Sequence, residues 1–213
     1  MIAILDYGAG NLTSVRLAFE RLGVAALVAP DAEAARPADR IIFPGVGSAG
    51  SGMAGLRERG FAELLTTAVT ENRPVLAICL GMQMIFEHSA EDDGTAGLAI
   101  LPGEVQPFQF PAAERVKIPH MGWNRVNFTR PHPVLDGVAD GEAFYFVHSY
   151  YARPKRPADT LGLTDYAGFE FTAIAARGSL FATQFHPERS GRAGLRLLHN
   201  FIEWEAGECY SNA

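Results

Sequence analysis

Short apolar runs alternate with amphipathic segments through the first half of the chain. Residues 2–5 are apolar and stop at the turn DYGAG. Residues 12–22 then place apolar side chains at roughly helical spacing, with Asn11 positioned to cap the helix and Gly23 to end it. The pattern predicts a buried strand followed by an amphipathic helix.

The same alternation repeats further along the chain. Residues 24–29 and 40–44 predict two more strands, and the second of these stops at the glycine-rich loop PGVGSAGSG. A helix is predicted over about residues 53–71, and the apolar run VLAIC at 75–79 predicts a central strand. Strands and helices that alternate at this spacing are typical of a parallel sheet with helices on both faces.

From about Leu98 the rhythm changes to strand-like runs with short turns between them. These runs are EVQPF, WNRVNF, AFYFVHSYY, TLGLTDY, FTAIAARG and SLFATQF, and residues 191–206 form a last amphipathic pattern. We expect an α/β fold with an open, mostly parallel twisted sheet flanked by helices and an antiparallel or mixed extension in the second half. Residues 1–207 are expected to form a single domain, with a frayed tail at 208–213.

Composition and charge narrow the function classes. The chain of 213 residues carries a net charge of −6, so it has no basic footprint for nucleic acid or an anionic membrane. Its first residues lack the basic segment of a signal peptide, and no apolar run approaches the ~20 residues that span a bilayer. Cys79 and Cys209 form no CxxC pair, which favours a reducing compartment. We expect a cytoplasmic protein without nucleic-acid or membrane partners.

A glycine turn near the N-terminus partly matches the dinucleotide-binding fingerprint. Gly8 and Gly10 follow a strand and precede a helix, and Asp31 lies about twenty residues further on. Thr13 replaces the third glycine of the fingerprint, and Asp31 falls beyond the predicted strand end. A Rossmann-type oxidoreductase therefore stays an alternative beside a plain glycine turn or a loop that contacts a partner.

Cys79 lies where the central strand is predicted to pass into a helix. Such a turn exposes a side chain above the carboxyl edge of the sheet, where open α/β folds bind ligands. The unpaired N–H groups of the helix N-terminus favour a thiolate and can hold an oxyanion. The alternative is a buried structural cysteine, a common fate for a free thiol.

The triplet His186-Pro187-Glu188 ends the last strand-like run. On extended backbone, residues two apart point to the same side, and Pro187 favours that geometry at His186. Glu188 can orient the imidazole and stabilise its charged form while the other ring nitrogen faces a nucleophile. The loop PGVG at 44–47 follows the neighbouring strand, and its glycines permit an N–H to turn toward an oxyanion.

These segments together resemble the class I, or triad, glutamine amidotransferases. The resemblance implies a nucleophile at Cys79, a general base and acid at His186, and a third triad member at Glu188. It also implies oxyanion N–H donors and contacts to the substrate, L-glutamine. The implied oxyanion residues are Val46, Gly47 and Leu80, and the implied glutamine contacts are Gln83, Glu91, Ser149 and Tyr150.

A narrower resemblance extends over nearly the whole chain. It is carried by DYGAGNL, FPGVG, KIPHMGWN, YFVHSYY and QFHPERS, which are similar to one subgroup of that family. The resemblance implies a heterodimer in which a separate (β/α)8-barrel cyclase receives ammonia and makes imidazole glycerol phosphate and aminoimidazole carboxamide ribotide in histidine biosynthesis. The interface residues that it implies are Asn11, Trp123, Asn124, Tyr145 and Arg189.

Other functions remain open from the sequence. The chain could be a glutaminase serving another synthase, or a non-catalytic regulatory module on the same fold. Trp123 and Tyr145 also fit half-buried strand aromatics that contact no partner. His120 and His148 lack metal-ligand spacing with each other, so we expect no metal and no cofactor.

Overall fold

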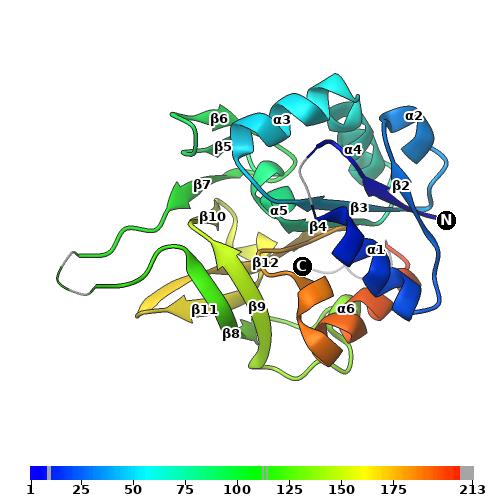
Figure 1. Ribbon diagram of the computed structural model, residues 1–213. Coiled ribbons are helices and arrows are strands. Elements are labelled where there is room, and N and C mark those ends of the chain that lie inside the picture. The colour runs from blue at the N-terminus through cyan, green and yellow to red at the C-terminus, as the bar shows by residue number, and fades with distance from the viewer. Residues whose placement is uncertain (9–10, 112, 114, 207–213) are drawn as a thin grey trace.

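The chain folds around one long mixed sheet that carries helices on both faces (Figure 1). The structure is a computed structural model, and it describes residues 1–8, 11–111, 113 and 115–206. Gly10, Cys209 and the tail predicted at 208–213 lie outside these residues. Within the described part of the chain, no helix has both the length and the apolar character needed to cross a membrane.

Five strands form the parallel part of the sheet. In sheet order they are β2 (Ala26–Ala29), β1 (Ile2–Leu5), β3 (Arg40–Gly45), β4 (Val75–Cys79) and β13 (Leu180–Thr183). The crossover connections place the strands of this part in one direction, so their carboxyl ends meet at one edge. The strands predicted at 2–5 and 75–79 are confirmed with the same boundaries.

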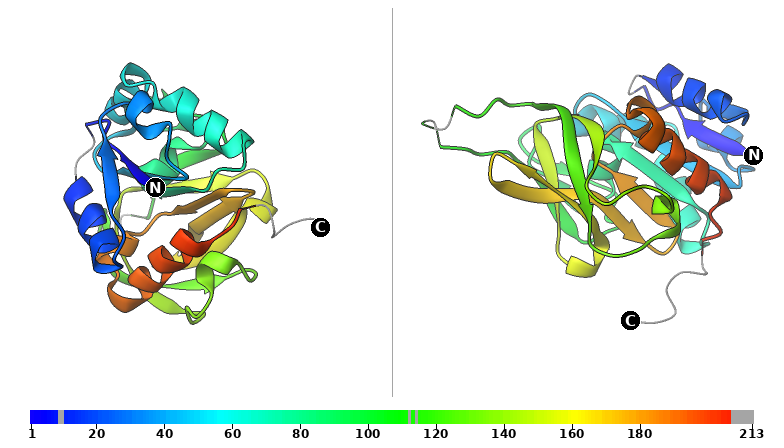
Figure 2. Two further views of the ribbon diagram at one scale, coloured as in Figure 1. Left: turned by 90° about the vertical axis from the view of Figure 1, so that its right-hand side faces the viewer. Right: turned by 90° about the horizontal axis from the view of Figure 1, so that it is seen from below.

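Two groups of helices cover the two faces of the parallel strands, as Figures 1 and 2 show. One face packs against α2 (Ala32–Ala35), α3 (Ala49–Glu58), α4 (Phe61–Thr70) and α5 (Leu80–Met84), and the other against α1 (Leu12–Arg21) and α6 (Gly191–Glu203). Alternate residues of each strand serve the two faces, so Leu76 and Ile78 pack on one and Val75 and Ala77 on the other. This arrangement confirms the predicted fold class.

The second half of the chain adds the antiparallel extension. Beyond β13 the sheet continues through β12 (Phe169–Arg177), β10 (Tyr150–Pro154), β7 (Gly103–Pro107), β5 (His88–Ser89) and β6 (Thr95–Ala96). A branch from β12 runs through β11 (Thr160–Tyr166), β8 (His120–Phe128) and β9 (Glu142–His148). Phe144 of β9 stacks on Phe185 with ring centroids 4.1 Å apart, which fastens the branch beside the end of β13.

Several sequence-based boundaries were wrong. The helix predicted over 53–71 is two helices, α3 and α4, because Gly60 between them adopts a left-handed φ of 74°. Asn11 precedes α1, but its φ of 68° is left-handed and its side chain makes no capping hydrogen bond. The run AFYFVHSYY is divided at Ser149 into β9 and β10.

Helix α3 contains three glycines, and one of them lets the helix lie close to the segment that follows β1. A Cβ added to Gly55 would lie 2.1 Å from the backbone oxygen of Tyr7, which has no room to move. A Cβ added to Gly52 would lie 2.8 Å from the Sδ atom of Met84, the far end of a flexible side chain. Gly55 therefore sets the approach of α3 to the sheet.

We expect Gly55→Ala to lower the free energy of unfolding by about 3 kcal/mol, because overpacking against backbone outweighs the better helix propensity of alanine. Gly52→Ala is the matched control in the same helix and should change stability by less than about 1 kcal/mol. Urea unfolding of the three proteins measures both differences. Equal losses for the two variants would contradict the close approach at Gly55.

Candidate active site

Three parallel strands bring the chemically active segments to one edge of the sheet. Gly45 of β3 lies opposite Cys79 of β4, and Ile78 lies opposite Thr183 of β13. The segments that follow these strands are the PGVG loop, the start of α5 and the chain leading to His186. Register in the sheet therefore sets three segments side by side that are far apart in the sequence.

Cys79 occupies a sharp turn between β4 and α5. Its φ of 55° and ψ of −109° are strained for a residue with a side chain, as expected for a nucleophile at a strand-to-helix elbow. The turn fits because Gly81 approaches β3 closely, where a Cβ would lie 2.0 Å from the Phe43 oxygen. The Cys79 side chain stays nearly buried, with 6% of the residue exposed.

Two polar groups contact the Cys79 sulfur. The backbone oxygen of Val147 lies 3.9 Å from Sγ, and Gln184 directs its Nε2 toward the sulfur at 3.8 Å. Gln184 is completely buried and was not among the residues predicted from the sequence. A polar side chain inside an apolar strand end is the signal that could have identified it, because burial there requires hydrogen-bond partners.

His186 and Glu188 form a buried pair. The His186 Nδ1 atom lies 2.9 Å from Glu188 Oε1, and both side chains are almost fully removed from solvent. The expected extended geometry holds at His186, whereas Pro187–Arg189 forms the short 3-10 helix η4. The other ring nitrogen, Nε2, has no hydrogen-bond partner within the described part of the chain.

The surroundings of His186 favour its protonated form. Burial alone lowers its pKa, but the Cys79 sulfur and the Glu188 carboxylate outweigh this effect and raise the pKa to about 10. The ring is therefore an imidazolium at neutral pH and can give up a proton from Nε2. A group of this kind suits proton donation to a departing nitrogen.

A cavity of about 370 Å³ opens beside Cys79. It brings together every residue predicted for the oxyanion site and for glutamine contact, namely Val46, Gly47, Leu80, Gln83, Glu91, Ser149 and Tyr150. Pro119, Val147 and His148 complete the lining and were missed by the sequence analysis. His186 and Glu188 are not among the lining residues of this cavity; they border a smaller crevice together with Asn11 and Val46.

Glu91 links the cavity to the start of α3. Its Oε2 accepts the Ala49 N–H at 2.8 Å, and the neighbouring Asp92 accepts the Gly50 N–H at 2.9 Å. Ser48, the residue before α3, makes no side-chain cap of its own, so these carboxylates satisfy free N–H groups of the helix. Burial raises the pKa of Glu91, against the effect of its hydrogen bond from Ala49.

The N-terminal turn supports the PGVG loop. The Tyr7 hydroxyl is buried and donates to the Pro44 oxygen at 2.6 Å, and burial raises the pKa of this phenol. Asp31 caps α2 by accepting the Ala34 N–H at 2.9 Å. Tyr7 and Asp31 therefore both make structural hydrogen bonds within the chain.

Four of the five residues predicted for a partner interface lie on β8, β9 and η4, whereas Asn11 lies apart from them at the start of α1. Trp123 and Tyr145 face each other across the strands with ring centroids 6.2 Å apart, and the Arg189 guanidinium lies 4.4 Å from the Tyr145 ring. Trp123 is exposed, as are Met121 and Ile118, which sequence reasoning missed. The side chains of Asn124 and Trp123 leave β8 on opposite faces, because consecutive strand residues alternate.

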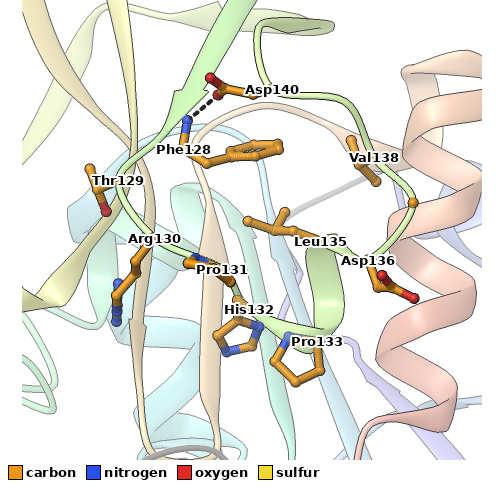
Figure 3. Close-up of a pocket in the computed structure, with 11 residues that line it drawn as sticks. Phe128, Thr129, Arg130, Pro131, His132, Pro133, Leu135, Asp136, Val138 and Asp140 are labelled. Atoms are coloured by element: carbon orange, nitrogen blue, oxygen red, sulfur yellow. Dashed lines mark hydrogen bonds between the residues drawn. The ribbon is translucent and has the colours of Figure 1, made fainter.

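A larger cavity of about 870 Å³ lies elsewhere and shares no residue with the Cys79 cavity (Figure 3). Residues between Phe128 and Asp140 line it, and the Phe128 N–H donates to Asp140 at 2.6 Å. None of the residues predicted for the site lies in it. In the part of the chain that the structure describes, no three His, Cys, Asp or Glu side chains are grouped to hold a metal ion.

Comparison with known proteins assigns the chain to a family. The family model "Glutamine amidotransferase class-I" matches residues 3–204. The chain therefore belongs to the class I glutamine amidotransferases, and its activity is that of a glutamine amidotransferase. The match spans the parallel strands, the Cys79 elbow and the segment of His186 and Glu188.

Curated relatives place the chain more narrowly within that family. Relatives in Thiobacillus denitrificans, Chromobacterium violaceum and Moorella thermoacetica all carry the name "Imidazole glycerol phosphate synthase subunit HisH". The first is 48% identical and covers 97% of this chain and 92% of its own length. The other two are each 46% identical and cover 96% and 95% of this chain and 98% and 94% of their own.

Solved structures support the fold alone, because their sequence identity is low. The structure of PurLQS from Thermotoga maritima superposes with a TM-score of 0.72 at 17% identity, covering 95% of this chain and 97% of that one. A crystal structure of a glutamine amidotransferase superposes with a TM-score of 0.70 at 18% identity and the same coverage. The chain therefore shares its fold with these two structures.

We expect Cys79→Ser to lower the pKa of His186, because the variant removes the sulfur that helps to raise it. Ring shifts of His186 followed by NMR from pH 5 to 11 measure the change. The stabilisation from the raised pKa is fully present below pH 6.5 and is lost as pH rises toward 10. An unchanged titration midpoint in Cys79→Ser would contradict the coupling, and His132, remote from Cys79, serves as the internal reference.

Proposed function

We propose that this chain is the glutaminase subunit of an imidazole glycerol phosphate synthase. In this proposal residues 1–207 form one amidotransferase domain that works in the cytoplasm and hydrolyses L-glutamine to glutamate and ammonia. The observation that carries the proposal is the buried pair of His186 and Glu188, held at the same sheet edge as the strained turn of Cys79. The names of the relatives support the particular synthase.

The first half of the reaction forms a thioester. The Cys79 sulfur attacks the side-chain amide carbon of glutamine, and the carbonyl oxygen becomes an oxyanion. N–H groups of Val46 or Gly47, together with Leu80, hold that charge. Loss of one such donor typically costs on the order of 100- to 1000-fold in rate. The C–N bond then breaks as the His186 Nε2 proton passes to the nitrogen, which leaves as ammonia.

The second half releases glutamate. His186 is now neutral and takes a proton from water, whose oxygen attacks the thioester carbon. The C–S bond breaks, the sulfur leaves as a thiolate beside the restored His186 imidazolium, and glutamate leaves the cavity. Glu188 acts through His186 in both halves, since its hydrogen bond to Nδ1 holds the ring orientation and stabilises the imidazolium.

The rest of the cavity fits the amino-acid end of glutamine. Glu91 supplies a carboxylate for the substrate ammonium, and the Ser149–Tyr150 backbone supplies N–H donors for the carboxylate. Gln83 contacts the same wall of the cavity, because its Nε2 donates to the Tyr150 oxygen at 3.0 Å. Binding by these groups would orient the amide of the substrate toward Cys79.

A separate acceptor for the ammonia is part of the proposal. Ammonia released into water is quickly protonated and stops being a nucleophile, so a direct acceptor avoids wasted glutamine. We propose a (β/α)8-barrel cyclase in a heterodimer with this chain. The exposed side chains of Ile118, Met121 and Trp123, next to Tyr145 and Arg189, form an apolar and cationic surface suited to this contact.

Replacement of Cys79 by alanine should abolish glutamine-dependent synthesis by the complex, because the thioester cannot form. Synthesis from added ammonium salt should persist at the parental rate, since the acceptor site lies on the other subunit. The rates of product formation with each nitrogen source measure the two effects. Cys209→Ala is the matched cysteine control and should change neither rate. Glutamine turnover that survives in Cys79→Ala would remove the nucleophile assignment.

Glutamine hydrolysis by the chain alone should be slow and should rise about 100-fold with the cyclase and its nucleotide ligand, the gain expected from completing one oxyanion donor. Glutamate release measured with and without each component tests this expectation. An unrelated protein such as albumin, added at the same concentration as the cyclase, controls for crowding. Equal rates with and without the cyclase would contradict activation by the partner.

A further inference from the structure

Two histidines that the proposed chemistry does not use are buried together beside the glutamine cavity. His120 of β8 and His148 of β9 are paired across the antiparallel strands, and their rings lie edge to face with centroids 5.0 Å apart. The His120 Nδ1 atom lies 3.0 Å from His148 Nε2. Phe146 and Phe171 pack around the pair with ring centroids about 5 Å away, so the two imidazoles lie in an aromatic enclosure.

The partners of the two rings specify one tautomer for each. The Tyr150 oxygen, 2.7 Å from His148 Nδ1, can only accept, so His148 carries its proton on Nδ1 and its Nε2 must accept. His120 therefore donates from Nδ1, and its Nε2 accepts from Asn124 Nδ2 at 3.2 Å. The Asn124 orientation agrees, because its Oδ1 accepts the Arg125 N–H at 2.8 Å.

Burial keeps both rings neutral. It lowers the pKa of His148 to about 3, with a smaller contribution from the charge of His186, and it lowers the pKa of His120 to about 4. A proton added to His148 would occupy its Nε2 and place two hydrogens between this atom and His120 Nδ1. A proton added to His120 would occupy its Nε2 and face the Asn124 amide hydrogens. The neutral state of both rings is thus the one in which every donor of this hydrogen-bond chain, from Asn124 to Tyr150, has an acceptor.

The hydrogen-bond chain ends on a carbonyl that belongs to the cavity wall. The Tyr150 oxygen accepts from His148 Nδ1 and also from Gln83 Nε2 at 3.0 Å. All three residues line the cavity beside Cys79. Two independent donors therefore fix the peptide that follows Tyr150, the first residue of β10 and the next residue after the break between β9 and β10 at Ser149.

We propose that His148 is a positioning residue for glutamine, with its tautomer set by His120 and Asn124. The Nδ1–H donor holds the Tyr150 peptide, and that peptide shapes the wall on which the amino-acid end of glutamine binds. This role rests on the proposed glutaminase function. It predicts an effect on glutamine affinity, because the wall does not touch the amide carbon that Cys79 attacks.

Side-chain replacements can separate this role from general packing. Asparagine can place its amide nitrogen where His148 carries Nδ1, so His148→Asn keeps the donor to Tyr150. In His148→Gln the amide reaches the position of Nε2, and the donor to Tyr150 is lost. An unsatisfied buried acceptor costs about 1–3 kcal/mol, which corresponds to about 5- to 150-fold in an equilibrium constant. We expect His148→Gln to raise the KM for glutamine about tenfold.

The experiment uses the chain in complex with its cyclase and measures glutamine hydrolysis and ammonia-dependent synthesis. Expected results are a raised KM and a kcat within about twofold for His148→Gln, a nearly parental KM for His148→Asn, and unchanged ammonia-dependent rates. His132→Asn, which alters a buried histidine remote from this cavity, is the matched control and should leave KM unchanged. Equal KM values for the two His148 variants, or a fall in kcat alone, would overturn the proposal.

A second measurement is independent of turnover and of variant folding. Nitrogen-15 NMR of the parental chain at pH 7 reports which ring nitrogen of each histidine carries the proton. We expect Nδ1–H tautomers at both His148 and His120, with slowly exchanging protons. An Nε2–H tautomer or an imidazolium at His148 would overturn the positioning role. If the parental complex hydrolysed no glutamine, the proposed function would fail. The tautomers measured by NMR would still show whether the hydrogen bonds from Asn124 to Tyr150 are formed as described.

Discussion

Parallel pairing of β4 with β3 on one side and β13 on the other is the constraint on which the site depends. The register sets Gly45 beside Cys79 and directs the chain after Thr183 to the same edge. A slip of one residue in β4 would exchange the two faces of the strand and bury the thiol among the helices. Strain at Cys79 is tolerated because the neighbouring strands and Gly81 hold the turn from several sides.

The polar groups of the site are buried among apolar strands, where an unpaired polar group lowers stability. A connected network of hydrogen bonds supplies partners for them. Gln184 reaches the Cys79 sulfur and accepts from Gln83, which in turn donates to the Tyr150 oxygen. Each of these groups is satisfied by another that also lines or borders the cavity. A network of this kind defines one geometry, because any rotation leaves a buried polar atom unpaired.

The sequence was most informative where one local pattern decides the outcome. The apolar run at 75–79, the triplet at 186–188 and the switch from alternating helices to strands were all readable without a structure. The break at Gly60 was missed because a single glycine inside a helical pattern is often tolerated. Val147 and His148 could not be placed, because their roles arise from pairing between strands that are distant from Cys79 in the chain.

His186 and His148 show how one residue type can be held in two opposite protonation states a short way apart. Both rings are buried, and burial by itself favours the neutral form of each. His186 has Cys79 and Glu188 beside it, so its charge is compensated and its pKa rises. His148 has a carbonyl and a neutral imidazole as partners, and the positive charge on His186 lowers the pKa of His148 further. The charged ring can therefore move protons while the neutral ring cannot compete for them, so the cavity wall and the catalytic pair stay chemically separate although both lie near Cys79.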